Sequence, residues 1–240
     1  MRTDLTLDRF LDGCIAAEQP KHGFRAGHDT VLLAAAIPPG RKILELGSGT
    51  GIASLCYAWR ARDAVVNGYE IDPDLVEIAN ANAARNGMGE RVNFTAGDIC
   101  TLADLGEEFE HAFFNPPFHP AVGTESPGAA RNSAKRDPGS MIADWTETAL
   151  RAVRPQGTVT AILRFDRVPE MLAAGKGKSA AVFPFYPRRG AEPKRAIVRI
   201  TAGKHGPARN CSGLILHRAD GGNTQEAEAI LRRGASLFMD

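Results

Sequence analysis

The chain has 240 residues, of which 43% are hydrophobic and 24% are charged, and its net charge is +1, as in an ordinary globular protein with one good core. No run of 18 apolar residues predicts a membrane span, and the first residues lack the apolar stretch of a signal peptide. The four cysteines form no C-x-x-C pair and the six histidines form no cluster. We therefore expect free thiols, a cytoplasmic location and no metal site.

Strands and helices alternate after an N-terminal leader, residues 1–27, which reads as irregular or as a hairpin. Asp29 is placed to cap the first helix. Asp72 and Pro73 are typical of a helix start, and Asn86 of a helix end. The apolar patterns predict helices over residues 30–36, from 52 to 58 and from 73 to 86, and strands over residues 41–46, 64–69 and 92–96.

The second half of the chain also alternates strands and helices at first, and then has several strands in succession. Its patterns predict strands over residues 111–114, 157–163, 180–186, 196–201 and 214–216, and helices over residues 140–153, 166–174 and from Thr224 onward. The short separation of the strands at 180–186 and 196–201 favours an antiparallel hairpin. The polar stretch between 120 and 139 lacks a periodic apolar face, so we expect a substrate loop there.

This order predicts a doubly wound α/β sheet in a single domain over residues 1–240. We expect a cofactor-binding and catalytic core over residues 28–163 and a basic C-terminal part over residues 164–240.

The tetrapeptide Asn115-Pro116-Pro117-Phe118 is the most informative motif in the chain. Its prolines must end the preceding strand, so a stiff loop leaves the carboxyl end of that strand, where open α/β sheets bind their ligands. The amide of Asn115 and the carbonyl of Pro116 can accept two hydrogens from a planar amine, while the Phe118 ring stacks on the heterocycle. The alternative interpretation is a turn with a surface asparagine and a core phenylalanine.

A second motif lies upstream, where Gly47-Ser48-Gly49-Thr50-Gly51 stands between a strand and a helix. Glycines in this context let a nucleotide approach the backbone closely. Glu70, nineteen residues past Gly51, ends the next strand and is the expected acceptor of ribose hydroxyls. Ile52 occupies the position where the dinucleotide fingerprint needs a glycine, which argues against NAD.

Charge is unevenly distributed along the chain. Residues 164–218 contain 12 basic and 3 acidic residues, a net charge of +9, whereas the remainder contains 17 basic and 25 acidic residues, a net charge of −8. This asymmetry favours a polyanion on one face over an ordinary solvated surface. The candidate RNA contacts are Arg131, Lys135, Arg136, Arg188, Arg189, Lys194 and Arg195.

Glu45, the three alternate glycines, Glu70 and Gly97-Asp98 together resemble the S-adenosylmethionine site of class I methyltransferases. With residues 20–35, 115–118 and 214–222, the chain resembles the bacterial tRNA adenine-N6-methyltransferases, which modify an adenine next to the anticodon of a valine tRNA. The resemblance implies a Rossmann-like seven-stranded sheet with a terminal antiparallel hairpin. It also implies S-adenosylmethionine as cofactor and methyl transfer to an exocyclic amine of RNA, with tRNA as the partner.

The resemblance also implies site residues. Ile71 would pack on the adenine of the cofactor, Asp98 would accept from its amino group or simply cap a helix, and Asn115 would lie beside the methyl group. The full cofactor set is Asp29, Glu45, Gly47, Ser48, Gly49, Gly51, Glu70, Ile71, Asp98 and Asn115, and the catalytic set is Asn115, Pro116, Pro117 and Phe118. Open alternatives are guanine N2 of rRNA or a protein glutamine as substrate, or a non-catalytic RNA- or cofactor-binding module.

Overall fold

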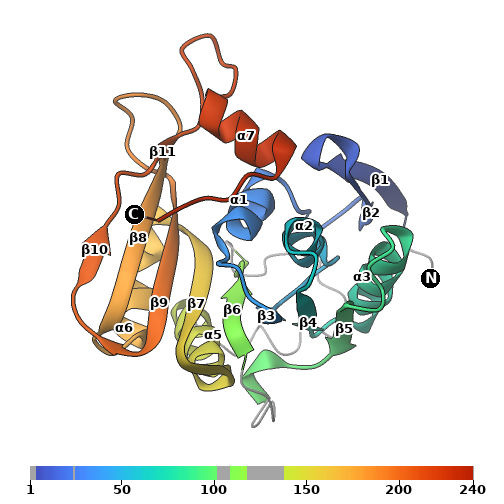
Figure 1. Cartoon of the computed structure of the whole chain (residues 1–240), viewed down its shortest axis with the longest axis horizontal. Coiled ribbons are helices and arrows are strands. Elements are labelled where there is room, and N and C mark those ends of the chain that lie inside the picture. The colour runs from blue at the N-terminus through green and yellow to red at the C-terminus, as the bar shows by residue number, and fades with distance from the viewer. Residues whose placement is uncertain (1–3, 24, 102–108, 118–137, 240) are drawn as a thin grey trace.

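The structure is a computed structural model that describes residues 4–23, 25–101, 109–117 and 138–239. Its centre is a mostly parallel sheet with helices on both faces, and a separate two-stranded hairpin lies at the N-terminal end (Figure 1). Within the described residues the large sheet has nine strands in the order β10-β8-β9-β7-β6-β3-β4-β5, with β11 also pairing with β8. The architecture is that of the doubly wound α/β proteins, as predicted.

The first half of the chain supplies the hairpin and one side of the sheet. Its strands are β1 (Leu5–Phe10), β2 (Ile15–Pro20), β3 (Lys42–Leu46), β4 (Val65–Glu70), β5 (Val92–Ala96) and β6 (Phe109–Phe114), and its helices are α1 (His28–Ala36), α2 (Ile52–Arg60) and α3 (Pro73–Arg85). Short 3-10 turns occupy Leu11–Gly13 and Ile99–Thr101.

The second half supplies the other side of the sheet. Its strands are β7 (Val153–Arg164), β8 (Lys178–Tyr186), β9 (Arg195–His205), β10 (Ala208–Asn210) and β11 (Leu214–Ile215), and its helices are α5 (Pro138–Ala152), α6 (Val168–Ala174) and α7 (Gln225–Arg233). A 3-10 turn at Phe165–Arg167 precedes α6.

The strand order places a topological switch point between β3 and β6. From β3 the chain builds outward through β4 and β5, and from β6 it builds in the opposite direction through β7. Because the connections diverge at this point, a crevice opens at the carboxyl ends of these two strands, which is where doubly wound proteins bind ligands. The predicted antiparallel hairpin is formed by β8 and β9, and β9 is also antiparallel to β7.

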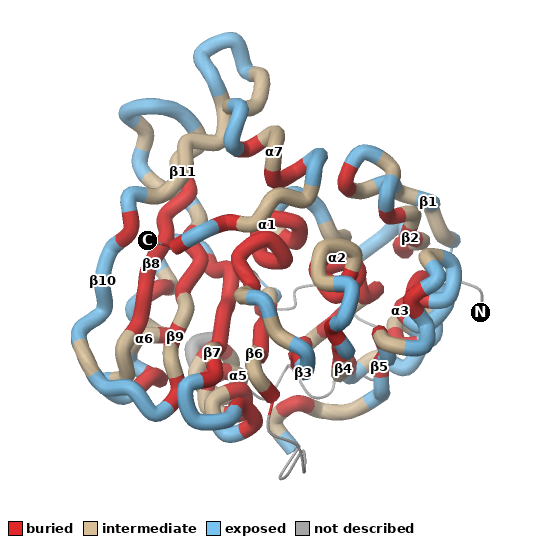
Figure 2. Tube along the Cα trace, in the orientation of Figure 1, coloured by how far each residue is buried: buried red, intermediate tan, exposed pale blue. Residues whose placement is uncertain are grey.

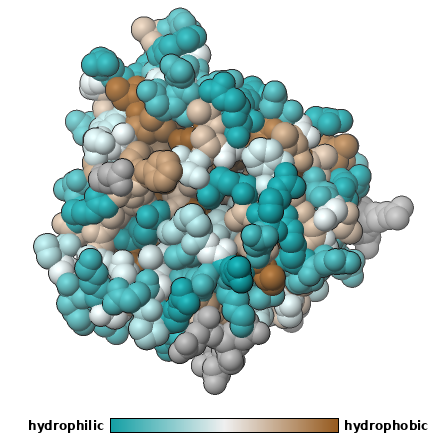
Figure 3. Space-filling model, in the orientation of Figure 1, coloured by the Kyte–Doolittle hydropathy of each residue, from teal (hydrophilic) through white to brown (hydrophobic). Residues whose placement is uncertain are grey.

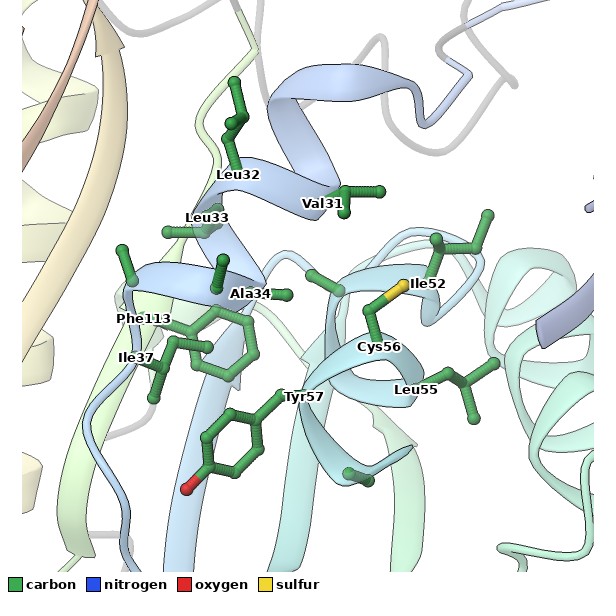
Figure 4. Packing of buried hydrophobic residues seen from close by; sticks show 14 of the residues in the cluster. Val31, Leu32, Leu33, Ala34, Ile37, Ile52, Leu55, Cys56, Tyr57 and Phe113 are labelled. Atoms are coloured by element: carbon green, nitrogen blue, oxygen red, sulfur yellow. The ribbon is translucent and has the colours of Figure 1, made fainter. Parts of the chain in front are cut away.

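Two apolar clusters cover the two faces of the sheet. One contains side chains of α1, α2 and α3, and the other those of α5 and α6. The central strands β3 and β6 between them are mostly buried (Figure 2). Phe113 of β6 lies under α1 beside Ile37, with Tyr57 of α2 nearby (Figure 4). The face of the molecule towards the viewer is mostly hydrophilic (Figure 3).

Helix α1 is apolar all round, with every residue from Thr30 to Ala36 buried. Such a helix must be covered on its outer side as well as its inner side. The C-terminal segment provides part of this cover, since the amide of Leu237 donates to the carbonyl of Ala35 at 2.9 Å. No helix in the described part of the chain is both long and apolar enough to cross a membrane.

The structure confirms some of the predicted details and corrects others. The leader forms the β1–β2 hairpin, which was one of its two predicted forms, whereas Gly27, not Asp29, is the N-cap of α1, so the predicted Asp29 cap is wrong. Asp72 does cap α3, accepting from the amide of Asp74 at 3.0 Å. The strand predicted over residues 214–216 is β11, and β10 was not predicted, so the nine described strands exceed the seven that the resemblance implies.

Candidate active site at the switch point

The glycine loop follows β3 directly and is tied to the neighbouring strand. The amides of Gly47 and Ser48 both donate to the carbonyl of Tyr69 in β4, at 2.8 and 3.1 Å. Gly47, Gly49 and Gly51 have φ values of 69°, 52° and 81°, which side-chain-bearing residues rarely adopt. The sequence therefore needs glycine at all three positions to make this turn.

The three glycines differ in what surrounds them. A Cβ atom on Gly47 would lie 2.5 Å from the Trp145 ring, and one on Gly51 would lie 2.6 Å from the Phe94 ring. Among the described residues, nothing lies within 4 Å of a Cβ placed on Gly49. The loop is thus packed at both ends and open in the middle, where a ligand can approach the backbone.

Glu70, the last residue of β4, reaches across to this loop. Its side chain is buried, with 9% of the residue exposed, and its two oxygens accept from the amides of Gly49 at 2.8 Å and Asp72 at 3.1 Å. Burial raises the pKa of its carboxyl group, while these amides oppose the shift. A carboxylate oxygen can accept two hydrogen bonds, so each oxygen keeps capacity for a ligand donor.

Glu45 lies inside the protein behind the same loop. It is 3% exposed, and the hydroxyl of Ser54 in α2 donates to its Oε2. Burial raises the pKa of Glu45 to about 8, with a smaller contribution from the nearby Glu70. Glu45 was predicted to contact a cofactor, and in the structure it is a buried carboxyl group that joins β3 to α2. Ser54 was missed by the sequence reasoning, because nothing local distinguishes it from other helix serines.

Ile71 and Asp98 lie at the carboxyl ends of the next two strands. Ile71 follows β4 and is 38% exposed, so its apolar side chain is available at this edge. Asp98 follows β5, and its Oδ1 accepts from the amide of Cys100 at 2.9 Å in a local turn. Ile71, Asp98, Glu70 and the glycine loop therefore all lie at the same edge of the sheet.

Asn115 stands next to the glycine loop because of the strand register. Leu46 of β3 pairs with Phe114 of β6 in a parallel ladder, so Gly47 and Asn115 leave adjacent strands at the same level, about 5 Å apart across the sheet. The Oδ1 atom of Asn115 is buried and has no hydrogen-bond partner among the described residues. Because buried acceptors are normally satisfied, this orphaned oxygen points to a ligand donor. Pro116 is buried and Pro117 exposed, and Phe118 lies outside the described residues.

Trp145 of α5 bridges the two loops. Its ring lies over Gly47 and also meets the ring of Phe114 edge-on, with 5.8 Å between centroids. Trp145 lies in the helix predicted over residues 140–153, and the sequence indicated no role for it. In the structure, this one side chain contacts both the glycine loop and the last residue of β6.

The basic turn, which we define as residues 187–194 between β8 and β9, lies at the same edge of the sheet. Arg195 at the start of β9 pairs with Arg164 at the end of β7, so the turn projects beyond the carboxyl end of β7. Arg188, Arg189 and Lys194 are exposed, and no ion pair holds their side chains within the described part of the chain. Arg131, Lys135 and Arg136 lie outside the described residues.

Asp29 and Arg195 were predicted for separate roles, and the structure pairs them. The Nε atom of Arg195 donates to Oδ2 of Asp29 at 2.9 Å, and each side chain is about one-third exposed. This ion pair joins the first turn of α1 to the start of β9. A ligand that contacts either side chain would meet it as part of this ion pair, and the cofactor role predicted for Asp29 and the RNA role predicted for Arg195 stay predictions.

Comparison with known proteins identifies the class of this site. Residues 26–132 match the family model of the methyltransferase small domain. A tRNA1(Val) (adenine(37)-N6)-methyltransferase from Phocaeicola vulgatus is 31% identical over 180 residues, which cover 72% of this chain and 75% of the relative. A protein of the same name from Actinobacillus succinogenes is 32% identical over 143 residues, which cover 58% of this chain and 60% of that relative.

Solved structures support the fold. A protein from Agrobacterium tumefaciens described as an O-methyltransferase has a TM-score of 0.73 at 22% identity, covering 87% of this chain and 98% of that one. A methyltransferase from Pyrococcus furiosus has a TM-score of 0.61 at 18% identity, covering 79% and 89% of the two chains. These two matches show the fold, and the relative from Phocaeicola vulgatus shows the family. The chain belongs to the family of the tRNA1(Val) (adenine(37)-N6)-methyltransferases, which are class I methyltransferases that use S-adenosylmethionine.

Proposed function

We propose that this protein transfers the methyl group of S-adenosylmethionine to the exocyclic N6 amine of an adenine in tRNA. The observation that carries the proposal is the register of β3 and β6, which sets the orphaned Asn115 oxygen beside the glycine loop. The related proteins from Phocaeicola vulgatus and Actinobacillus succinogenes are named as adenine-N6-methyltransferases, which supports adenine N6 as the methylated atom.

The residues at the switch point fit the cofactor by the chemistry of their side chains. The ribose hydroxyls, the α-amine and the adenine amine of S-adenosylmethionine are all hydrogen-bond donors. The described edge offers acceptors, namely the carboxylate of Glu70, the carboxylate of Asp98 and the hydroxyl of Ser48, which is buried without a hydrogen-bond partner among the described residues. Gly49 would allow close approach and Ile71 would contact the adenine ring. When bound, the cofactor supplies an electrophilic methyl group.

The protein's task is then to position a weak nucleophile. The lone pair of an aromatic amine is delocalised into its ring, so the nitrogen must be held in an attacking geometry. The Asn115 oxygen and the Pro116 carbonyl would accept its two hydrogens, and Phe118 would stack on the base. Holding the nitrogen about 3–3.5 Å from the methyl carbon lowers the activation free energy of the transfer by several kcal/mol. The product can lose its proton to water, so no general base is required.

An adenine in RNA must be unstacked before it can reach this site. We propose that the exposed cations of the basic turn hold the neighbouring phosphates while the base enters. Arg188, Arg189 and Lys194 have no partner side chains within the described residues and lie at the same edge as Asn115. Contacts from Arg131, Lys135 and Arg136 remain a prediction. A tRNA substrate also agrees with the expected cytoplasmic location.

The test is methylation of purified tRNA, total rRNA, DNA and a release factor with labelled S-adenosylmethionine, followed by nucleoside mass spectrometry. We expect N6-methyladenosine in tRNA only. Asn115→Ala should lower turnover by about 100-fold or more while the cofactor still binds in calorimetry. Asn93→Ala, on the exposed side of β5, is the matched control and should retain activity. Label in another substrate, or full activity of Asn115→Ala, would refute the proposal.

A further inference from the structure

One exposed aromatic side chain at the catalytic edge has no role in the site described above. The large apolar residues that the described structure leaves exposed are Leu7, Val65, Ile71, Phe165 and Phe238. Val65 begins β4 at the opposite edge of the sheet, and Leu7 and Phe238 lie on the N-terminal hairpin and the C-terminal segment. Ile71 belongs to the cofactor site, which leaves Phe165, with 38% of the residue exposed.

The strand register gives the position of Phe165 relative to Asn115. Phe114 of β6 pairs with Ala161 of β7, so Asn115 lies level with Ile162. Phe165 is three residues further along, about 10 Å in the strand direction and one strand, about 5 Å, to the side. Stacked nucleotides advance about 3.4 Å along a strand. The two offsets combine to about 11 Å, so the backbone of Phe165 lies about three stacked nucleotides from a base bound at Asn115.

The backbone around Phe165 is held on both sides. Arg164 and Asp166 flank it and form two hydrogen bonds with each other, at 3.0 and 2.8 Å. The amide of Phe165 donates to the carbonyl of Lys194 in the basic turn at 3.1 Å. Because the amide bond holds the backbone of Phe165 before any ligand arrives, binding has only the side chain of this residue to order.

Exposed cations lie on the turn to which the Phe165 backbone is bonded. The carbonyl that accepts from the Phe165 amide belongs to Lys194, and Arg188 and Arg189 lie on the same turn, all three with exposed side chains. An exposed aromatic ring beside unpaired cations is the combination by which proteins bind single-stranded nucleic acid, where the ring stacks on a base and the cations contact phosphates. A free apolar ligand would not need the cations, and a duplex would not offer an unstacked base.

We propose that Phe165 stacks on the base of a nucleotide flanking the target adenine and so holds the unstacked RNA strand at the catalytic edge. This inference rests on the proposed function, because it takes RNA as the substrate. It adds to that function a second base contact, made by a side chain of the 3-10 turn that follows β7 and not by the Asn115 loop. The ring positions substrate and takes no part in methyl transfer.

The test uses an anticodon stem-loop with 2-aminopurine, a base whose fluorescence is quenched by stacking, placed in turn at the three nucleotides on each side of the target adenine. We compare the wild type with Phe165→Ala, Phe165→Leu and Phe165→Tyr. Phe238→Ala is the matched control, since Phe238 is a 76% exposed phenylalanine on the C-terminal segment. Thermal unfolding of each variant checks that the fold is intact.

We expect one flanking position to be quenched by the wild type and by Phe165→Tyr, and not by Phe165→Ala or Phe165→Leu. The KM for tRNA should rise about 5- to 100-fold in the last two variants, with kcat for bound tRNA and the affinity for S-adenosylmethionine unchanged. The leucine variant separates stacking from apolar burial alone, and Phe238→Ala should behave as the wild type.

The outcomes separate this inference from the proposed function. If the wild type methylates tRNA and Phe165→Ala retains its KM and its quenching, the inference is overturned and the proposed function stands. If the wild type leaves every tRNA unmethylated, the proposed function fails, and the quenching experiment alone decides whether Phe165 stacks on RNA. Equal loss in the tyrosine and alanine variants would contradict a stacking role.

Discussion

The buried carboxyl group of Glu45 makes the stability of this protein depend on pH in a way that one substitution should remove. The pKa of Glu45 is raised to about 8 from 4.5, chiefly by burial. Between these two values the native protein keeps a proton that the unfolded chain has released, so stability falls as pH rises. One pKa unit is worth about 1.4 kcal/mol, so the shift corresponds to about 3–5 kcal/mol lost between pH 4.5 and pH 9.

Glu45→Gln replaces this carboxyl with a neutral group of similar size that can still bond to Ser54. We expect the variant and the wild type to have similar free energies of unfolding at pH 5. The variant should become the more stable protein as pH rises, with a difference approaching 3–5 kcal/mol at pH 9. The measurement is urea unfolding of the cofactor-free protein at half-unit pH intervals.

Glu77→Gln, on the exposed side of α3, is the control that should follow the wild-type curve. Glu70 remains in every variant, so the comparison contains the titration of Glu45 and its coupling to Glu70. If the stability of Glu45→Gln changes with pH in parallel with the wild type, Glu45 does not titrate in this range. The assignment of a protonated, buried carboxyl joining β3 to α2 would then be wrong.

Two further predictions concern the glycine loop and the basic turn. Gly47→Ala should destabilise the fold more than Gly49→Ala. The Cβ of an alanine at position 47 collides with Trp145, whereas an alanine at position 49 adds only a backbone strain of about 1 kcal/mol. Gly49→Ala should instead weaken S-adenosylmethionine binding measured by calorimetry, and equal effects of both variants on unfolding would refute this division. Replacing Arg188, Arg189 and Lys194 by alanine should reduce the slope of log affinity for tRNA against log salt by about 2–3. An unchanged slope would remove the basic turn from the RNA interface.

Features set by local chemistry were predictable from the sequence. Asp72 and Pro73 start α3 as predicted, because a capping carboxylate and a proline at the first helical position act within a few residues. The glycine loop was predicted for the same reason, since its φ values depend on its own residues. Strand β10 was missed because its three residues, Ala208–Asn210, are all exposed and show no apolar alternation.

Contacts between distant segments were not predictable in this way. Asp29 and Arg195 are 166 residues apart, and each alone has the features of a functional surface residue, so only the structure reveals that they neutralise each other. Trp145 fills the space between Gly47 and Phe114, and both of these contacts belong to other segments of the chain than the helix that carries Trp145. Strand β7 begins at Val153 in spite of Pro155, because an irregular register opposite Phe109 and His111 accommodates the proline.

The direction of β9 decides which edge of the sheet becomes the basic one. Because β9 is antiparallel to β7, the turn before Arg195 emerges level with Arg164, at the carboxyl edge that also carries Asn115. A parallel β9 would begin at the other edge, about 20 Å away over the seven paired residues. The cations would then lie more than two Debye lengths, each about 8 Å at physiological salt, from the switch point. The terminal antiparallel hairpin therefore links the charge asymmetry of the chain to the proposed chemistry at Asn115.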